Sequence, residues 1–187
     1  MENWYNNNLS SYTTYISKEA IYCNDRELKP TSTYSTAKVD FYYASYGRLA
    51  TNKTPSYNCT NIKDAFSVNN AEAKLTYPIG LMTIDEIAYA GGKYLKGLSS
   101  PYAWYYLNSA GGSITGDNWW WSMSPRDWSS GGSSHIWVVA GSNSPGYLSN
   151  GYVGATSTGV RPVISLERDV LWSDGNGSSS SPYRINY

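Results

Sequence analysis

The sequence of 187 residues has little charge: 14 lysines and arginines balance 14 aspartates and glutamates, and charged residues make up only 15% of it. Nucleic-acid-binding proteins usually carry a basic face that neutralises phosphates, so this balance argues against that class. No apolar run approaches the roughly 20 residues that span a bilayer, so we expect no direct membrane insertion. The residues after Met1 are neither basic nor apolar and predict no signal peptide. Either the protein is not exported by that route, or its export segment is missing from this chain.

Side chains that carry catalysis or bind metals are also scarce. His135 is the single histidine, and no serine, cysteine or aspartate stands at a recognisable spacing that would make it a catalytic base. The sequence has no Cys-x-x-Cys motif, no Asp-x-Asp calcium loop and no glycine-rich phosphate loop. We therefore expect no enzymatic activity, no metal and no cofactor. In an exported chain Cys23 and Cys59 would form one disulfide, whereas in the cytosol they would be free thiols.

Tyrosine and tryptophan are abundant: the chain has 19 tyrosines and 8 tryptophans but only 2 phenylalanines. Tyr and Trp beside Ser, Asn and Gly are typical of antibody binding surfaces, although an exported β-protein with tyrosines in its core would have the same composition. Seven of the eight tryptophans lie at position 104 or later, and no lysine follows Lys96. The length fits one domain over residues 1–187. Because interfaces are rich in Trp and Tyr and poor in Lys, we expect the binding surface in the second half. The scaffold-rich part of the domain is residues 1–100, and its sheet and binding part is residues 101–187; the second half could also simply hold the sheet and the core.

Hydrophobic periodicity predicts helices first and short strands later, which is typical of an α+β domain. Apolar residues at helical spacing favour a helix over residues 4–16, and Thr83 and Glu86 form a capping box for a helix that ends at Gly91. Residues 75–82 are expected to be extended. Short apolar runs predict antiparallel strands at 119–123, 135–140, 146–148, 152–153, 160–166 and 183–185, with another at 39–44. The expected fold is loop-rich, with helices packed on a small twisted antiparallel sheet.

Three motifs occur in order: YPIGLMTIDE at 77–86, WWSMSP at 120–125 and GVRPVISL at 159–166. With the weaker pieces YCNDR at 22–26 and SPYRI at 181–185, they resemble a family of exported bacterial and phage domains with a C-type lectin fold. The resemblance is to the branch of that fold that contains the formylglycine-generating enzymes. Some members are the variable proteins of diversity-generating retroelements. The resemblance implies a C-type lectin-like domain located outside the cell, at the cell surface or on a phage.

The chain departs from two functional classes of that fold. Sulfatase-activating enzymes need active-site cysteines in the C-terminal part of the domain, and no cysteine follows Cys59. Calcium-dependent lectins carry Glu-Pro-Asn or Gln-Pro-Asp, and neither tripeptide occurs here. The resemblance therefore implies neither that activity nor sugar or calcium binding.

In the variable proteins, the stretch between the second and third motifs is rewritten at adenine-containing codons, so exposed residues change while the scaffold stays. Rewriting an asparagine codon reaches many residue types but not Lys, Glu, Gln, Met or Trp. Residues 126–157 contain none of the first four, and Trp128 and Trp137 would have to be fixed framework. The resemblance thus implies that residues 126–157 form a diversified binding surface.

Strand alternation predicts which face of the strand at 135–140 is exposed. We expect Ile136 and Val138 to face the core, which leaves Trp137 on the other face. Trp137 is then a candidate exposed anchor, since tryptophans are frequent hot spots of interfaces. The alternative is that Trp137 packs against Trp120 or Trp128.

The candidate binding residues are the small, polar and aromatic residues of the segment at 126–157. They are Arg126, Asp127, Ser129, Ser134, His135, Trp137, Ala140, Ser142, Asn143, Tyr147, Ser149, Asn150, Tyr152, Ala155, Thr156 and Ser157. His135 is expected at the rim of the surface. Arg161 stands in an apolar run and is expected to have a structural role.

These patterns lead to one hypothesis and two alternatives. The hypothesis is a non-catalytic domain that binds an unknown protein or glycan target through residues 126–157, with rigid rings supplying buried area. Alanine at Tyr147, Tyr152 or Trp137 would then weaken target binding without unfolding the domain. The alternatives are a carbohydrate-binding module that stacks sugars on its rings, and an adhesive or structural tip domain of a surface fibre.

Overall fold

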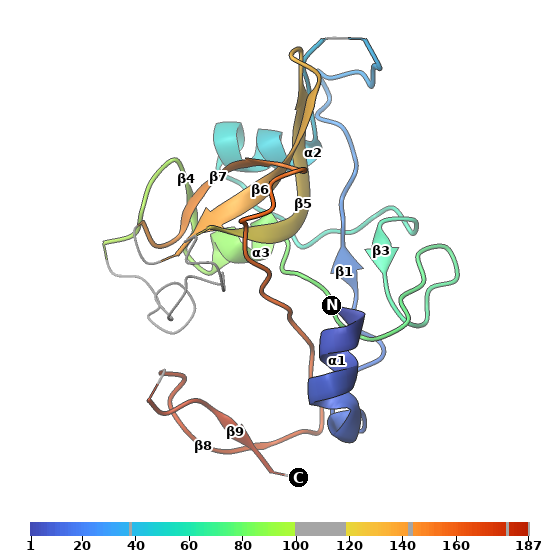
Figure 1. Cartoon of the computed structure of the whole chain (residues 1–187), viewed down its shortest axis with the longest axis vertical. Helices are drawn as coiled ribbons and strands as arrows, with labels where there is room; N and C mark the ends of the chain where they lie inside the picture. Colours follow the sequence, from blue (N-terminus) through green and yellow to red (C-terminus); the bar gives the residue numbers. More distant parts are fainter. Residues whose placement is uncertain (38, 100–118, 142–143, 179, 187) are drawn as a thin grey trace.

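The computed structural model shows a mixed α and β protein built around one five-stranded sheet (Figure 1). It describes residues 1–37, 39–99, 119–141, 144–178 and 180–186. The strand order is β2 (Phe41–Tyr42), β5 (Trp119–Ser129), β6 (Ser133–Ala140), β7 (Tyr147–Tyr152) and β4 (Lys93–Tyr94). Neighbouring strands are antiparallel except β7 and β4, which are parallel. The architecture agrees with the predicted α+β class, but the sheet is mixed and not purely antiparallel.

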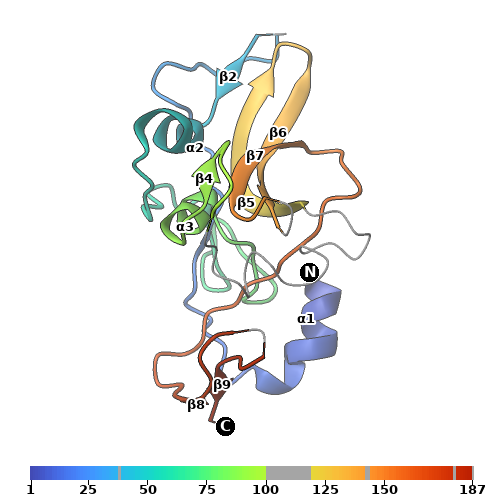
Figure 2. The same cartoon turned by 90° about the vertical axis from the view of Figure 1, so that its left-hand side faces the viewer.

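The remaining elements are short and surround this sheet. They are α1 (Glu2–Leu9), the 3₁₀ turn η1 (Ser10–Tyr12), β1 (Tyr22–Cys23), α2 (Ala44–Tyr46), the π-helix η2 (Gly47–Asn52), β3 (Ala65–Phe66), α3 (Ile84–Tyr89), β8 (Trp172–Asp174) and β9 (Arg184–Ile185). Helices α2 and α3 lie on the same side of the sheet (Figure 2), whereas α1 and the β8–β9 pair lie at the opposite end of the molecule. None of the described helices is long and apolar enough to cross a membrane.

Helix α3 begins as the sequence predicts. The backbone N–H of Glu86 donates to Thr83 Oγ1 at 3.1 Å, and the carboxylate of Glu86 accepts from the Thr83 N–H at 2.7 Å. The apolar side of the helix, Ile84 and Ile87, is fully buried. Gly91 follows the helix with φ +101°, a conformation that glycine adopts at low cost. The capping box therefore fixes the start of the helix that closes one side of the core.

The N-terminal helix is shorter than predicted. We expected it to continue to residue 16, but α1 ends at Leu9 and Ile16 instead pairs with Leu166 in an isolated bridge. The Asn and Ser residues along this stretch compete for backbone hydrogen bonds and favour turns over helix. Tyr5 and Ile16 are still buried together with Ile79 in a second small core. Tertiary packing, not helical periodicity, therefore explains the spacing of these apolar residues.

The strand predictions are confirmed at the centre of the sheet. The runs at 119–123 and 135–140 lie within β5 and β6, both of which are longer than predicted. The runs at 146–148 and 152–153 overlap one strand, β7. These three strands form the largest part of the sheet.

The strand predictions are less accurate away from the centre. Residues 160–166 form no regular strand and make only isolated bridges, one of them between Val163 and Gly80. Pro162 has no N–H to donate to a strand ladder, which limits pairing there. The run at 39–44 contains the two residues of β2, after which the chain turns into α2 at Ala44. The run at 183–185 contains β9, which pairs with β8.

The main core takes residues from both halves of the chain. Its fully packed members are Leu49, Ile84, Ile87, Trp120, Trp137, Val139 and Leu148. The sheet of the second half thus supplies more of this cluster than the helices of the first half. The alternative interpretation of the tryptophan-rich half, that it holds the sheet and the core, is therefore correct for Trp120 and Trp137.

The three long motifs contact one another beside this core. The N–H of Trp121 donates to the carbonyl of Gly159 at 3.0 Å, and the N–H of Met123 donates to the carbonyl of Met82 at 2.8 Å. Ser124 Oγ accepts from the N–H of Ile84 at 3.0 Å, at the start of α3. The guanidinium carbon of Arg161 lies 4.7 Å from the ring centre of Trp120, in line with the predicted structural role of Arg161. These motifs therefore act in the scaffold.

A disulfide and a buried ion network hold the segment at 22–26. Cys23 and Cys59 form the disulfide that the sequence predicts for an exported chain. Next to it, Arg48 donates to both carboxylate oxygens of Asp85 at 2.8 Å and also pairs with Asp25. Burial by itself lowers the pKa of Arg48, but hydrogen bonds and charge from Asp85 and Asp25 outweigh it and raise the pKa above its ordinary value. Arg48 therefore remains charged and joins η2 to the start of α3.

Tyr22 makes the stability of the fold sensitive to alkaline pH. Its side chain is buried, and its hydroxyl donates to the carbonyl of Pro78 at 3.0 Å. Burial is the largest cause that raises the pKa of Tyr22 from 10.0 to about 12. The contribution of the neutral phenol is complete below pH 10, the unfolded value, and is lost as the pH rises through about 12. The rise of the pKa from 10.0 to about 12 corresponds to a loss of about 3 kcal/mol.

We expect Tyr22→Phe to remove this alkaline sensitivity. At neutral pH the variant should be less stable by about 1 kcal/mol, because it lacks one hydrogen bond. Between pH 10 and pH 12 it should lose less stability than the parent, as measured by urea denaturation at each pH. Tyr57→Phe is the control, since Tyr57 is 67% exposed and should behave like the parent. If the free energy of unfolding falls equally with pH in the parent and in Tyr22→Phe, the prediction is contradicted.

Candidate binding site

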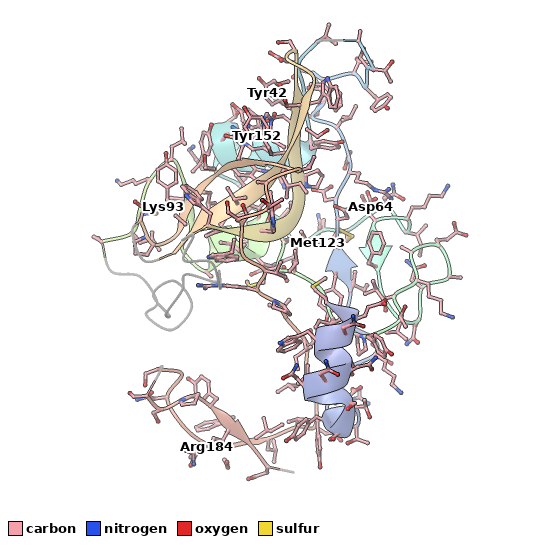
Figure 3. The ribbon with its side chains drawn as sticks, viewed as in Figure 1. Tyr42, Asp64, Lys93, Met123, Tyr152 and Arg184 are labelled. Carbon is pink, nitrogen blue, oxygen red and sulfur yellow. A yellow bond between two sulfur atoms is a disulfide. The ribbon has the colours of Figure 1, made fainter. Side chains whose placement is uncertain are left out.

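One row of side chains crosses four strands of the sheet near the β5–β6 hairpin. Tyr42 on β2 lies opposite Asp127 on β5. Asp127 lies opposite His135 on β6, and His135 lies opposite Tyr152 on β7. Residues directly opposite each other in a sheet point to the same face. The labelled side chains of Tyr42 and Tyr152 lie in the upper part of the molecule in Figure 3. The row therefore brings two tyrosines, a carboxylate and an imidazole onto one face.

A bulge in β5 adds an arginine to this face. Pro125 pairs with Ile136 and Asp127 pairs with His135, so Arg126 is an extra residue with no partner of its own on β6. Bulges turn the bulged residue toward the side of its neighbour and re-aim its side chain. Arg126 and Asp127 are accordingly consecutive and both buried, at 9% and 5% exposure.

Arg126, Asp127 and His135 form one hydrogen-bonded unit, which we call the charged cluster. Asp127 Oδ1 lies 2.6 Å from His135 Nδ1, and Asp127 Oδ2 pairs with Nη1 of Arg126. Nη2 of Arg126 donates to the hydroxyl of Tyr94 at 3.0 Å. Charge-assisted hydrogen bonds of this kind fix the geometry of both partners. The cluster thus holds the imidazole and one tyrosine hydroxyl in place.

Four tyrosines cover the charged cluster; we call Tyr42, Tyr46, Tyr94 and Tyr152 the tyrosine face. The guanidinium carbon of Arg126 lies 4.8 Å from the ring centre of Tyr46 and 5.7 Å from that of Tyr94. Tyr42 contacts Tyr46 at 4.4 Å between ring centres. Burial is the largest cause that raises the pKa of Tyr46, and Tyr94 raises it further. The raised pKa keeps the phenol of Tyr46 neutral, and the face presents rings and hydroxyls.

The most exposed member of the face is Tyr152, at 60%. Its ring centre lies 4.7 Å from that of His135. Tyr42, Tyr46 and Tyr94 are half-buried. An exposed ring thus rests on an imidazole that a buried carboxylate holds.

The carboxylate of Asp127 joins the other two members of the charged cluster. Both carboxylate oxygens of Asp127 are engaged, one by His135 and one by Arg126. Among the described residues, no hydroxyl or thiol hydrogen-bonds to the second nitrogen of His135. No group of three or more His, Cys, Asp or Glu residues that could hold a metal occurs in the part of the chain that the structure describes. The arrangement fixes the imidazole of His135 and the hydroxyl of Tyr94.

The structure corrects the prediction for Trp137. We expected an exposed anchor, but Trp137 is 0% exposed and its Nε1 donates to Ser45 Oγ at 3.0 Å. It lies in the same core cluster as Trp120, as the alternative interpretation proposed. Ser45 and Tyr46 of α2 and Leu49 of η2 cover Trp137 itself, so its ring cannot touch a target.

The sequence analysis assigned one face of β6 to the core and the other to solvent, and this assignment was incomplete because both faces are covered. Val138, assigned to the core, is buried, but Ile136 is only half-buried and Val139 on the opposite face is fully buried. A side chain at Gly151 would come within 2.7 Å of Val138 and 3.0 Å of Trp121, so the second face is closely packed too. Both faces of β6 are therefore covered over most of its length.

The other predicted binding residues divide by exposure. Arg126, Asp127, His135 and Ala140 are buried, so the expected rim position of His135 is wrong and little of these four side chains is open to a target. Exposed residues are Asn150, Tyr152, Thr156 and Ser157, and half-buried ones are Ser129, Ser134, Tyr147, Ser149 and Ala155. Ser142 and Asn143 lie outside the described residues. The exposed residues cluster in and after β7.

Sequence reasoning missed two parts of the site. Tyr42, Tyr46 and Tyr94 come from the half of the chain that was assigned to the scaffold, and nothing in their spacing predicts that they meet. The partner of His135 was missed as well, although a signal for it exists. A hairpin centred on Gly131 places residues at equal distances from it opposite each other, and positions 127 and 135 satisfy that condition.

Comparison of the chain with protein-family models, with curated proteins and with solved structures finds no match. The site is therefore interpreted from its own geometry. In that geometry the tyrosine face covers the buried charged cluster, in which Asp127 pairs with Arg126 and His135.

Proposed function

We propose that the protein is a non-catalytic target-binding domain with a C-type lectin-like architecture, acting outside the cell. Its binding surface is the tyrosine face together with the exposed residues of β7 and the segment after it. The observation that carries the proposal is the close contact of the exposed Tyr152 ring with the ring of His135, which Asp127 and Arg126 hold from below. The target is a protein or a glycan.

Rigid support is what makes such a surface effective. Binding costs conformational entropy for every side chain that becomes ordered, and a ring that is already held costs less. Tyrosine has only two side-chain torsions and offers both an apolar ring and a hydroxyl. A tyrosine whose neighbours are fixed by buried charge-assisted hydrogen bonds therefore suits target recognition.

We further propose that the domain is the variable protein of a diversity-generating retroelement. The support is that Trp137, which adenine rewriting cannot produce, is buried as a framework residue has to be. Trp128, the other unreachable residue of the segment, lies against Phe41 with parallel rings. The exposed residues of β7 are all reachable.

Sibling genes test this second proposal directly. A near-copy of the codons for residues 126–157, differing only at adenines and lying beside a reverse transcriptase gene, is the expected finding. Among siblings, variation should fall on Ser149, Asn150 and Tyr152 and should spare Arg126 and Asp127, because the latter two support the surface. Equal variation at buried and exposed codons would contradict the proposal.

The binding surface is tested with Tyr152→Ala. We expect the variant to lose at least about tenfold in affinity for a target identified on a glycan array or a protein array, since removing a central ring costs more than about 1.4 kcal/mol. Its stability should change by less than about 0.5 kcal/mol, as for other surface substitutions. Tyr57→Ala is the control, because Tyr57 is equally exposed but lies elsewhere. Unchanged affinity in Tyr152→Ala would remove β7 from the surface.

Two alternative functions are a carbohydrate-binding module and a tip domain of a surface fibre. Ring faces suit sugars, and inhibition of binding by a free sugar would favour the carbohydrate-binding module. The exposed Leu171, Trp172 and Tyr183 on and beside the β8–β9 pair would suit a contact within a surface fibre. Self-association that Trp172→Ser abolishes would favour that role.

A further inference from the structure

A pocket of about 460 Å³ lies beside the tyrosine face, between η2, α3, β4 and β7. Its floor is apolar and includes Leu49, Ala88 and Leu148. Leu49 and Leu148 are buried members of the main core. Pockets of this size with apolar walls and a few polar groups are typical of small-ligand sites. The floor thus suits an apolar body.

The walls of the pocket are built from fixed backbone. Strand β4 is held by hydrogen bonds from the Lys93 N–H to Gly146 and from the Leu95 N–H to Leu148, at 2.8 and 3.1 Å. A side chain on Gly92 would come within 3.0 Å of Leu148 and 2.9 Å of the carbonyl of Ile87. The absence of that side chain lets β4 approach α3 and shapes the pocket.

The rim of the pocket is basic. Lys53, Lys93 and Lys96 line it, and among the described residues no aspartate or glutamate does so. Lys53 Nζ donates to the carbonyls of Leu49 and Ala50 at 3.2 and 2.8 Å, and lies 5.7 Å from the ring centre of Tyr94. Lys93, labelled in Figure 3, and Lys96 are exposed and have no ion-pair partner within the described part of the chain. Three cations and no acid favour an anionic group at the opening.

We propose that this pocket binds a small amphipathic carboxylate, with its apolar body on Leu49, Ala88 and Leu148 and its carboxylate at Lys93 and Lys96. Charge complementarity selects the anion, and the apolar floor selects a hydrocarbon body over a plain inorganic ion. The inference goes beyond target binding and does not depend on it, because the ligand is tested without a target.

Octanoate is the probe, measured by isothermal titration calorimetry on the whole chain. Octanol and octylammonium have the same hydrocarbon body without the negative charge. We expect octanoate to bind at least tenfold more tightly than either, and its affinity to fall as salt concentration rises. Equal binding of the three probes, or no binding of octanoate, would overturn the proposal.

Two variants locate the octanoate. Lys93→Gln with Lys96→Gln should weaken octanoate binding at least about fivefold and leave octanol binding unchanged, since only octanoate carries a charge that the two lysines attract. Lys63→Gln with Lys74→Gln is the matched control, because these exposed lysines lie away from the pocket. Ala88→Phe, which fills the pocket, should abolish binding of octanoate while thermal unfolding confirms a folded domain. Octanoate binding that survives both changes would overturn the proposal.

Discussion

Replacing Trp137 with alanine is expected to lower the free energy of unfolding by about 3–5 kcal/mol, the range for removing a fully buried aromatic side chain. The cavity would open in the main core, beside the rings of Tyr46 and Tyr94. The substitution also removes the hydrogen bond from Trp137 Nε1 to Ser45. Since small domains have only about 5–15 kcal/mol of stability in total, a large part of the molecules could unfold. Urea denaturation followed by circular dichroism measures the loss.

The matched control is Trp172→Ala. Trp172 is 64% exposed, and its loss should cost less than about 1 kcal/mol. Weakened target binding by Trp137→Ala should then scale with the unfolded fraction and vanish under conditions that keep the variant folded. If Trp137→Ala keeps the stability of the parent but does not bind the target, Trp137 contacts the target directly, as the sequence analysis expected.

The error over Trp137 shows where strand alternation stops being informative. Alternation predicts which residues share a face, and in β6 it groups them correctly. It does not tell which face is covered when both carry large apolar residues, as in the stretch from Ile136 to Val139. That depends on α2 and η2, which come from about 90 residues earlier in the chain, as the bond from Trp137 to Ser45 shows.

Local signals, by contrast, were sufficient for α3. A capping box needs only Thr83 and Glu86, three residues apart, so its geometry follows from the sequence alone. The disulfide between Cys23 and Cys59 was predictable once export was assumed, because no other cysteine competes. The sequence alone therefore predicts features that depend on neighbouring residues, such as the capping box, or that have one possible pairing, such as the disulfide.

The candidate site, by contrast, depends on contacts between distant parts of the chain, which local signals do not predict. The bulge that turns Arg126 inward depends on a register shift that no periodicity announces. The tyrosine face joins residues from β2, α2, β4 and β7, which are separated by up to 110 positions from Tyr42 to Tyr152. Composition could indicate that tyrosines gather somewhere. It could not show that three of the four tyrosines of the face come from the part assigned to the scaffold.

Removing the carboxylate of Asp127 is expected to cost about 3–5 kcal/mol of stability, because it leaves the guanidinium of Arg126 buried without a counter-charge. The aspartate also holds His135, so Asp127→Ala should free the imidazole beneath Tyr152. Target affinity should therefore fall even in the folded fraction. Urea denaturation and binding at a matched folded concentration separate the two effects.

The double variant Arg126→Met, Asp127→Ala decides whether the cost comes from the unpaired charge. With both charges gone, most of the lost stability should return, since an apolar replacement of a buried ion pair is often nearly neutral. Asp174→Ala is the control, because Asp174 forms an exposed pair with Arg184 at 3.7 Å that contributes less than about 1 kcal/mol. If Asp127→Ala costs no more than this control, the charged cluster is not what supports the tyrosine face. If the double variant regains stability but not affinity, the cluster serves recognition by holding His135 under Tyr152.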